Sequence, residues 1–315
     1  MTSFPNWGHE TDGDEVVKSY SQQVAGRIFA VTGPTPNGLG EGTVLALAKG
    51  LPAALLLIGR TPAKYAPVVQ AVRAIDPSID VRTYEIDLSS FSSIRAGASR
   101  VLADFPKVDV LINNAATNIR TYRRTVDGIE EIFATNYVGP FLLTNLLMPA
   151  LLRSEAPRVV NLTSLVHREG TGDFSDCNFE KSEYKWWAAY AQSKLGNLLF
   201  TRRLATVLGH RGLVSLSVHP GTLWNTNALT LVPAEELQQL KILVTNEWQC
   251  KEKTLGQGVA TTCVAALDPK LGECNGAYME DCQVAEPHCP AAKSVDGPEE
   301  LWNLSEEFVG ETFVY

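Results

Sequence analysis

The stretch Arg27-Ile28-Phe29-Ala30-Val31-Thr32-Gly33-Pro34-Thr35-Pro36-Asn37-Gly38-Leu39-Gly40 decides the fold of this 315-residue chain. Its first six residues predict a buried strand, and a helical pattern from Glu41 to Lys49 follows the glycines. Strand, glycine-rich turn and helix in this order are the context of a dinucleotide-binding site, although the turn alone could be an ordinary tight turn. The glycines allow the backbone to approach a pyrophosphate, which the N-terminus of the helix would face.

Six further segments have the apolar pattern of buried strands and alternate with helical patterns; they span residues 53–58, 81–86, 108–112, 158–162, 214–218 and 276–279. This alternation predicts an α/β protein, a single-domain Rossmann fold with a doubly wound, seven-stranded parallel sheet and helices on both faces. Residues 1–26 are expected to form an N-terminal extension before the domain of residues 27–315. The mixed stretch of about 222–252 is expected to be an insertion over the substrate pocket.

Composition excludes several classes of partner. The net charge is -8, the pI is about 5.2, and no basic stripe occurs, which argues against nucleic acid and anionic membranes. No apolar run approaches the roughly 18 residues of a membrane span. The first 26 residues lack the apolar core of a signal peptide, so we expect a cytoplasmic protein. The six cysteines have no metal-site spacing, and we expect reduced thiols and no metal.

The candidate catalytic pair lies in Tyr190-Ala191-Gln192-Ser193-Lys194. A Tyr and a Lys four residues apart share one face of a helix, so both side chains can reach the same bound molecule. A nearby ammonium is expected to lower the pKa of the phenol from about 10 toward the range that a general acid or base needs. Without other evidence, a Tyr and a Lys at this spacing could simply be a side-chain pair on the surface of a helix.

Polar residues and glycines follow several of the predicted strands, at the edge where parallel sheets bind ligands. They are Asp87-Leu88, Asn113-Asn114-Ala115, Ser164 and Pro220-Gly221-Thr222. Asp87 could bind an adenine amino group or cap the next helix, and Ser164 could donate to a substrate oxygen or be a helix cap. In the long helix predicted from Gly128 to Arg153, Pro140 lacks the N–H that would bond to the carbonyl of Asn136, which could then hold a water molecule.

The end of the second strand bears on the choice of nucleotide. An enzyme that prefers NAD usually has a carboxylate there to bind the ribose hydroxyls, whereas this chain has Gly59-Arg60-Thr61 with Lys64 behind. Arg60 offers a cation to a 2′-phosphate, so we expect NADP(H) rather than NAD(H). The alternative is that Arg60 is a solvated surface residue.

Taken together and in this order, these motifs resemble the short-chain dehydrogenase/reductase family. The resemblance extends from Gly26 to the C-terminus. It is carried by Thr32-Gly33, Gly38-Leu39-Gly40, Asp87-Leu88, Asn113-Asn114-Ala115, Asn136, Ser164, Tyr190 with Lys194, and Pro220-Gly221. The long gap between Ser164 and Tyr190, and the tail with Tyr278 to Cys282 and Leu301-Trp302, look most like the retinol-dehydrogenase-like and WW-domain-oxidoreductase-like branch.

The resemblance implies an enzyme with the catalytic residues Asn136, Ser164, Tyr190 and Lys194. Tyr190 would exchange a proton with a carbonyl or alcohol oxygen that Ser164 binds, Lys194 would bind the nicotinamide ribose, and Asn136 would position a water. The cofactor would supply or accept the hydride. The implied cofactor-binding residues are Gly33, Asn37, Gly38, Leu39, Gly40, Arg60, Asp87, Leu88, Asn113, Ala115, Tyr190, Lys194, Pro220, Gly221 and Thr222.

The chain departs from the family pattern in three places. Four residues rather than three separate Gly33 from Gly38, and two of them are prolines without an N–H for phosphate. Ala116 replaces the usual Gly after Asn113-Asn114-Ala115. The Thr that commonly contacts the carboxamide comes one position late, at Thr226, so Thr222 or Asn225 would take that role.

Several expectations follow from the family and from apolar residues in or near the predicted insertion. Trp186, Trp187, Leu223 and Trp224 indicate a bulky hydrophobic carbonyl or alcohol as the small-molecule substrate. A homodimer, if one forms, would use the helices that start near Gly128 and Tyr190. The second functional hypothesis is a non-catalytic NADP(H)-binding sensor or scaffold on the same fold, and a third is a non-redox step with bound cofactor.

Overall fold

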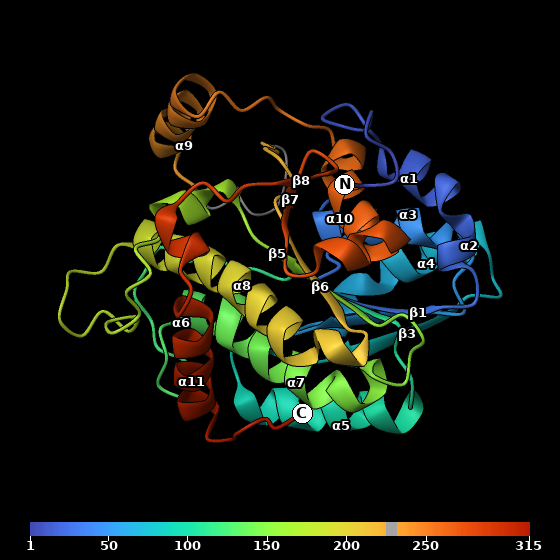
Figure 1. Cartoon of the computed structure of the whole chain (residues 1–315), viewed down its shortest axis with the longest axis horizontal. Helices are drawn as coiled ribbons and strands as arrows, with labels where there is room; N and C mark the ends of the chain where they lie inside the picture. The colour runs from blue at the N-terminus through green and yellow to red at the C-terminus, as the bar shows by residue number, and fades with distance from the viewer. Residues whose placement is uncertain (225–231) are drawn as a thin grey trace.

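The computed structural model of the chain describes residues 1–224 and 232–315. Its centre is one sheet of eight strands in the order β3-β2-β1-β4-β5-β6-β7-β8 (Figure 1). The strands are β1 (Ile28–Thr32), β2 (Ala54–Gly59), β3 (Asp80–Glu85), β4 (Val110–Asn113), β5 (Arg158–Leu162), β6 (Val214–Val218), β7 (Tyr278–Glu280) and β8 (Gln283–Ala285). The first seven pair in parallel, which confirms the predicted seven-stranded Rossmann sheet.

The eighth strand corrects the predicted strand count. β8 pairs antiparallel with β7 and forms a hairpin at the edge of the sheet. Its turn is made by Asp281 and Cys282, which adopt φ values of 45° and 62° without the Asn-Gly or Asp-Gly sequence that marks such turns. A strand of three residues after an unmarked turn has too little pattern to be recognised in the sequence.

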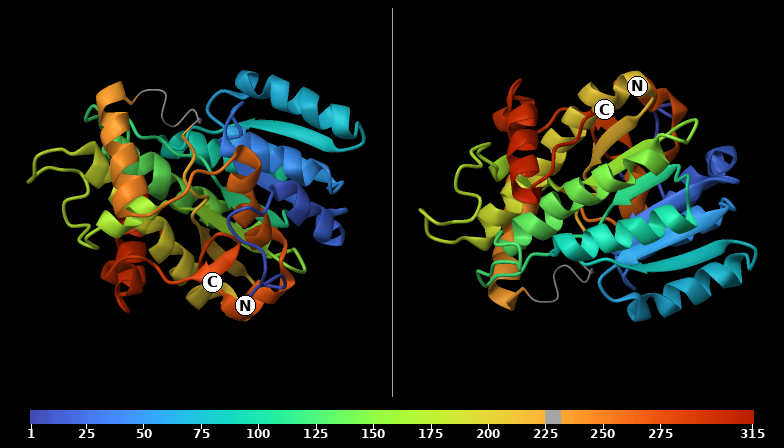
Figure 2. Two further views of the ribbon diagram at one scale, coloured as in Figure 1. Left: turned by 90° about the horizontal axis from the view of Figure 1, so that it is seen from above. Right: turned by 90° about the horizontal axis from the view of Figure 1, so that it is seen from below.

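Helices cover both faces of the sheet, as predicted (Figure 1). The helices on one face are α1 (Gly13–Ser19), α2 (Ser21–Val24), α3 (Leu39–Ala48), α4 (Ala66–Ile75) and α10 (Leu255–Leu267). Those on the other face are α5 (Phe91–Asp104), α6 (Glu131–Phe133), α7 (Gly139–Leu151), α8 (Trp186–Leu208) and α11 (Gly297–Val309). The view from below in Figure 2 shows α5 and α7 side by side across this second face.

The side chains of each central strand divide between two apolar cores. In β1, Ala30 packs toward α5, α7 and α8, whereas Phe29 and Val31 pack toward α3, α4 and α10. This alternation follows from the two-residue period of a strand, and it explains why a strand buried on both faces is apolar throughout.

Residues 1–26 pack on the core that contains Phe29 and Val31. Trp7, Val16, Tyr20 and Val24 are buried there, and α1 lies along α10 and α3. The side chain of Asp12 accepts the Asp14 N–H and so caps the start of α1.

The helix predicted from Gly128 to Arg153 is interrupted around Asn136. The segment Ala134–Val138 is a π-helix, η2, which joins α6 to α7. The Gly139 N–H bonds to the carbonyl of Ala134, five residues back, and Pro140 has no N–H to offer. This widened turn replaces the regular helix at the point where Pro140 predicted a break.

Candidate active site

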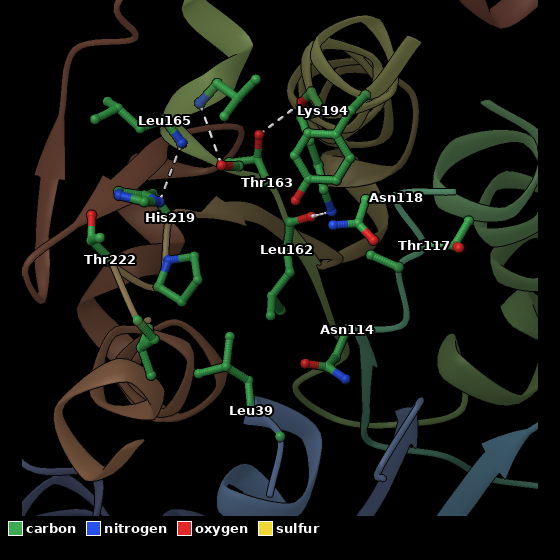
Figure 3. A pocket seen from close by; sticks show the side chains of 18 of the residues that line it. Leu39, Asn114, Thr117, Asn118, Leu162, Thr163, Leu165, Lys194, His219 and Thr222 are labelled. Carbon is green, nitrogen blue, oxygen red and sulfur yellow. Dashed lines mark hydrogen bonds between the residues drawn. The ribbon is translucent and has the colours of Figure 1, made fainter. Parts of the chain in front are cut away.

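A cavity of about 460 Å³ opens at the carboxyl edge of the parallel strands (Figure 3). It is bounded by the loop between β1 and α3, by the segments that follow β4, β5 and β6, and by the first turns of α8. Its outer wall comes from α9 (Ala234–Ile242) and the π-helix η6 (Leu243–Glu247). Strand ends, a glycine loop and a helical lid thus enclose one space, which is where doubly wound sheets bind ligands.

The glycine loop forms a tight backbone cradle along this cavity. Gly33 adopts a φ of 66°, and a Cβ there would lie 2.9 Å from Ala115. A Cβ on Gly40 would lie 2.5 Å from the Gly33 carbonyl oxygen and 2.6 Å from Asn114 Nδ2. The N-cap of α3 is Gly38, which has no side chain to cover the helix N-terminus. These features fit a dinucleotide, because its pyrophosphate needs close backbone contact and free N–H groups.

Most of the predicted cofactor-binding residues line the cavity. They are Gly33, Gly38, Leu39, Gly40, Ala115, Tyr190, Lys194, Pro220, Gly221 and Thr222. Asn225 and Thr226, considered for the carboxamide, lie outside the described residues.

Five predicted cofactor residues do not line this cavity, and other contacts account for three of them. Asp87 Oδ1 accepts from the Ser89 N–H and hydroxyl at 3.0 and 2.6 Å, while Leu88 is buried in a core. Asn113 Nδ2 donates to Thr144 and Asn161 between strands and helix. Asn37 and Arg60 are exposed, and Arg60 follows directly after β2 on the ligand-binding edge.

Asn114 lines the cavity in place of the predicted Asn113. Its Nδ2 donates to the Thr32 carbonyl at 2.7 Å, and its N–H donates to Thr32 Oγ1 at 3.0 Å. The sequence signal was the pair of adjacent asparagines, Asn113 and Asn114. Which of them faces the cavity depends on where β4 ends, and the apolar pattern of a strand defines its end only to within a residue or two.

Tyr190, Lys194 and Ser164 come together at the cavity. Tyr190 and Lys194 project from the same face of α8, and Lys194 Nζ lies 5.6 Å from the centre of the Tyr190 ring. Ser164 lies two residues after the end of β5, and its side chain hydrogen-bonds to Tyr190. Lys194 Nζ donates to the Leu162 carbonyl at 2.9 Å (Figure 3).

Burial dominates the pKa values of this pair. It raises the pKa of Tyr190 to about 12, and the hydrogen bond from Ser164 offsets part of that rise. Burial also lowers the pKa of Lys194 to about 8. The expected lowering of the Tyr190 pKa by the lysine is therefore wrong in direction for this structure, since desolvation disfavours the phenolate more than the neighbouring groups favour it.

Asn136 is buried and does not line the cavity, but it anchors a residue that does. Its Oδ1 accepts the Thr117 N–H at 2.7 Å, and its Nδ2 donates to the Thr117 carbonyl at 2.9 Å. The same Nδ2 lies 3.2 Å from Ser193 Oγ, which donates to the Tyr190 carbonyl. The Asn136 side chain thus ties the loop after β4 to the Tyr190 helix.

The backbone after β6 bends around a buried lysine. Gly221 adopts a φ of 91°, and any Cβ there would collide with the side chain of Lys253. Lys253 pairs with Asp281 at 2.6 Å, and its N–H donates to the Thr222 carbonyl at 2.8 Å. Sequence reasoning missed Lys253, which lies some thirty residues along the chain from the turn it supports.

Tryptophans form the wall of the outer half of the cavity. Trp186 and Trp187 pack edge to face with ring centres 5.4 Å apart, and Trp248 lies 6.3 Å from Trp187. The guanidinium carbon of Arg120 lies 4.6 Å from the centre of the Trp186 ring, and that of Arg168 lies 4.5 Å from the centre of the Trp248 ring. These cation–π contacts stabilise the positions of both tryptophans. Leu240 and Val244 complete the wall from the lid. Like Trp248, they belong to the stretch of about 222–252 that was expected over the substrate pocket, but the sequence pattern did not single them out.

Within residues 1–224 and 232–315, no group of histidine, cysteine and acidic side chains is arranged to hold a metal ion. None of the helices in the same residues is both long and apolar enough to cross a membrane.

The sheet topology, the glycine cradle and the Tyr190–Lys194–Ser164 group define a dinucleotide-binding α/β protein of the Rossmann class. A family model described as short chain dehydrogenase matches residues 27–237. The chain belongs to the short-chain dehydrogenase/reductase family, in its retinol-dehydrogenase-like branch.

The relatives include retinol dehydrogenase 12 of Mus musculus, which is 35% identical over 291 residues; the match covers 91% of this chain and 88% of that protein. Retinol dehydrogenase 13 of Mus musculus is 39% identical over 198 residues, covering 63% and 59% of the two chains. Among solved structures, an uncharacterized protein from Mycobacterium Paratuberculosis aligns with a TM-score of 0.70 and 29% identity, covering 92% of this chain and 96% of that one.

Proposed function

We propose that this protein is an NADP(H)-dependent oxidoreductase that transfers a hydride between the nicotinamide and a carbonyl or alcohol of a hydrophobic small molecule. The observation that supports this most directly is the position of Tyr190. Its side chain lines the same cavity as the glycine cradle and the tryptophan wall, hydrogen-bonded to Ser164 and one helical turn from Lys194.

Each of these residues has a role in the proposal. The nicotinamide, when bound, supplies or accepts the hydride. Tyr190 gives a proton to the carbonyl oxygen during reduction and takes one from the hydroxyl during oxidation. Ser164 donates a hydrogen bond to the same oxygen, which stabilises the charge that develops there. The Lys194 ammonium binds the ribose hydroxyls of the nicotinamide nucleotide.

Asn136 has a less direct role. It holds Thr117 at the cavity wall and, through Ser193, the helix of Tyr190. We propose that its own carbonyl, four residues before Pro140, positions the water that resupplies the proton that Tyr190 gives away during reduction.

The preference for NADP(H) rests on the end of β2. No carboxylate occurs at Gly59, Arg60 or Thr61, and Arg60 is an exposed cation there. A guanidinium can bind a 2′-phosphate through two parallel hydrogen bonds.

The aromatic wall and the retinol dehydrogenase relatives favour an apolar substrate. Trp186, Trp187 and Trp248 present flat apolar surface to the cavity, and Leu240 and Val244 face them. Aldehydes with long or aromatic apolar groups, and the matching alcohols, are therefore the class to test first.

The test is a titration with NADPH and NADH, followed by turnover with cinnamaldehyde and decanal. Tryptophans line the cavity, so quenching of their fluorescence reports binding. Tyr190→Phe should keep most of the affinity for NADPH, because the glycine cradle is unchanged, but lose about 10² to 10⁴ in kcat, the usual contribution of a general acid. Tyr122→Phe, at an exposed tyrosine, is the control. Unchanged turnover in Tyr190→Phe would refute the mechanism, and tight NADPH binding without turnover of any aldehyde would favour the sensor or scaffold.

A further inference from the structure

The peptide unit that follows Ser164 is held at both edges by histidines. The Ser164 carbonyl oxygen lies 2.7 Å from His167 Nδ1, and the Leu165 N–H donates to His219 Nδ1 at 3.3 Å. Figure 3 shows the second of these bonds beside the cavity. Because a peptide unit is planar, bonds at its C=O and N–H edges together fix its orientation, and with it the ψ of Ser164.

The partners of His167 define its tautomer. The Ser164 carbonyl can only accept, so Nδ1 carries the hydrogen. The backbone N–H of His288 can only donate, and it lies 3.0 Å from Nε2, which therefore accepts. The neutral ring with hydrogen on Nδ1 satisfies both partners, and the other tautomer satisfies neither.

The surroundings of His167 keep its ring neutral and fixed. The residue is fully buried, and burial lowers its pKa to about 4. Its ring packs edge to face on Tyr278 with centres 5.1 Å apart, and Cys289 Sγ donates to its carbonyl at 3.3 Å. The short helix Leu165–Glu169, which Ser164 caps, is thus tied to β7 and to the segment after β8.

We propose that His167 is a positioning residue: by holding the Ser164 carbonyl, it aims the Ser164 hydroxyl at Tyr190 and at the reacting oxygen. This role rests on the proposed function of Ser164 and Tyr190. His167 is absent from the residues that line the cavity in the described part of the chain, so it acts through Ser164 and not by contact with substrate. A small misplacement of a group at the reacting centre is enough to slow a reaction strongly.

Two substitutions separate the two hydrogen bonds of the ring. In His167→Asn the amide nitrogen takes the place of Nδ1 and can still donate to Ser164, but the bond from His288 is lost. In His167→Gln the amide oxygen takes the place of Nε2 and can still accept from His288, but the bond to Ser164 is lost. Each variant loses one buried hydrogen bond, so both should lower the midpoint of thermal unfolding.

We expect kcat to depend on the hydrogen bond between the ring and the Ser164 carbonyl, and not on the bond from His288. His167→Asn should keep kcat for cinnamaldehyde within about threefold of the wild type, whereas His167→Gln should lose about ten- to a hundredfold. The Kd for NADPH, measured by tryptophan quenching, should stay unchanged in both. In a Ser164→Ala background the Asn and Gln variants should have the same kcat within about twofold, because there is no hydroxyl left to aim.

Equal kcat in His167→Asn and His167→Gln would overturn the positioning role, as would a difference that persists without the Ser164 hydroxyl. These results leave the proposed function intact if Tyr190→Phe and Ser164→Ala both have a kcat far below that of the wild type, with the residual turnover of Ser164→Ala still measurable. Full turnover in Tyr190→Phe would instead overturn the proposed function, and the positioning role with it.

Discussion

The Lys194 ammonium donates to the carbonyl oxygen of Leu162 at 2.9 Å, and that oxygen also accepts from Asn197 Nδ2 at 3.1 Å. Lys194 is buried, and no carboxylate contributes to the shift in its pKa. A carbonyl oxygen compensates a buried positive charge only in part. The buried ammonium of Lys194 therefore lowers the stability of the fold.

The first prediction is that Lys194→Met stabilises the protein at pH 7. The pKa of Lys194 falls from the usual 10.5 to about 8. Since one pKa unit corresponds to about 1.4 kcal/mol, removing the buried charge should raise the free energy of unfolding by up to about 3 kcal/mol. Between about pH 8 and 10.5 the unfolded chain binds this proton and the folded chain does not, so the wild type regains stability as pH rises and the difference shrinks.

Urea unfolding at a series of pH values from 7 to 10.5 measures this difference. Lys64→Met, at an exposed lysine, is the control and should change stability by less than about 0.5 kcal/mol. A Lys194→Met protein that is less stable than the wild type at pH 7 would contradict the assignment of Lys194 as a destabilising buried charge.

The second prediction concerns the glycine cradle. In Gly40→Ala the new methyl would meet the Gly33 carbonyl 2.5 Å away, so the loop must move. Overpacking of this kind costs about 1–3 kcal/mol of stability. Because the moved loop no longer fits the pyrophosphate, the Kd for NADPH should rise at least about tenfold, which corresponds to about 1.4 kcal/mol.

Gly272→Ala is the matched control, because its Cβ would lie 3.9 Å from Cγ2 of Val214, an ordinary van der Waals distance. Thermal unfolding and a fluorescence titration with NADPH measure both effects. Wild-type affinity in Gly40→Ala would show that the loop is more tolerant than its packing indicates.

The seven parallel strands could be predicted from the sequence because strands buried on both faces have a clear apolar pattern. β1, β2 and β4 are almost continuously apolar, since helices cover both their faces. The ends of these strands, and the helical spacing of Tyr190 and Lys194, then indicated which residues meet at one edge. These features are local, so a single sequence carries them.

The rest of the site depends on contacts between residues far apart in the chain. The support of Ser164 comes from His288 and Cys289 through His167, and the outer wall of the cavity from Trp248. No periodicity marks such residues. The pKa of Tyr190 was predicted in the wrong direction for a similar reason, because the extent of burial at a helix face is set by the surrounding loops.

The third prediction is that the protein is a monomer of 34.3 kDa at micromolar concentration. Helix α11 and the C-terminal tail cover α7 and α8, the helices on which the expected homodimer would form. The Trp302 ring lies 5.0 Å from that of Phe141, and the Tyr315 hydroxyl donates to Asn145 at 2.6 Å. A dimer on this face would have to displace these contacts. Sedimentation equilibrium decides the question, and a stable dimer would require a different face.

The last prediction tests the choice between the two nucleotides. Arg60 is exposed beyond β2, and neither Gly59 nor Thr61 provides a carboxylate for a ribose hydroxyl. If Arg60 binds the 2′-phosphate, Arg60→Ala removes a charged hydrogen-bond donor, and the Kd for NADPH should rise about tenfold or more. The Kd for NADH, which has no 2′-phosphate, should change less than about twofold. Arg73→Ala, at an exposed arginine of α4, is the control for a general change in surface charge. If Arg60→Ala weakened the binding of both nucleotides equally, or of neither, Arg60 would be a solvated surface residue. The end of β2 would then give no reason to expect a preference for NADP(H).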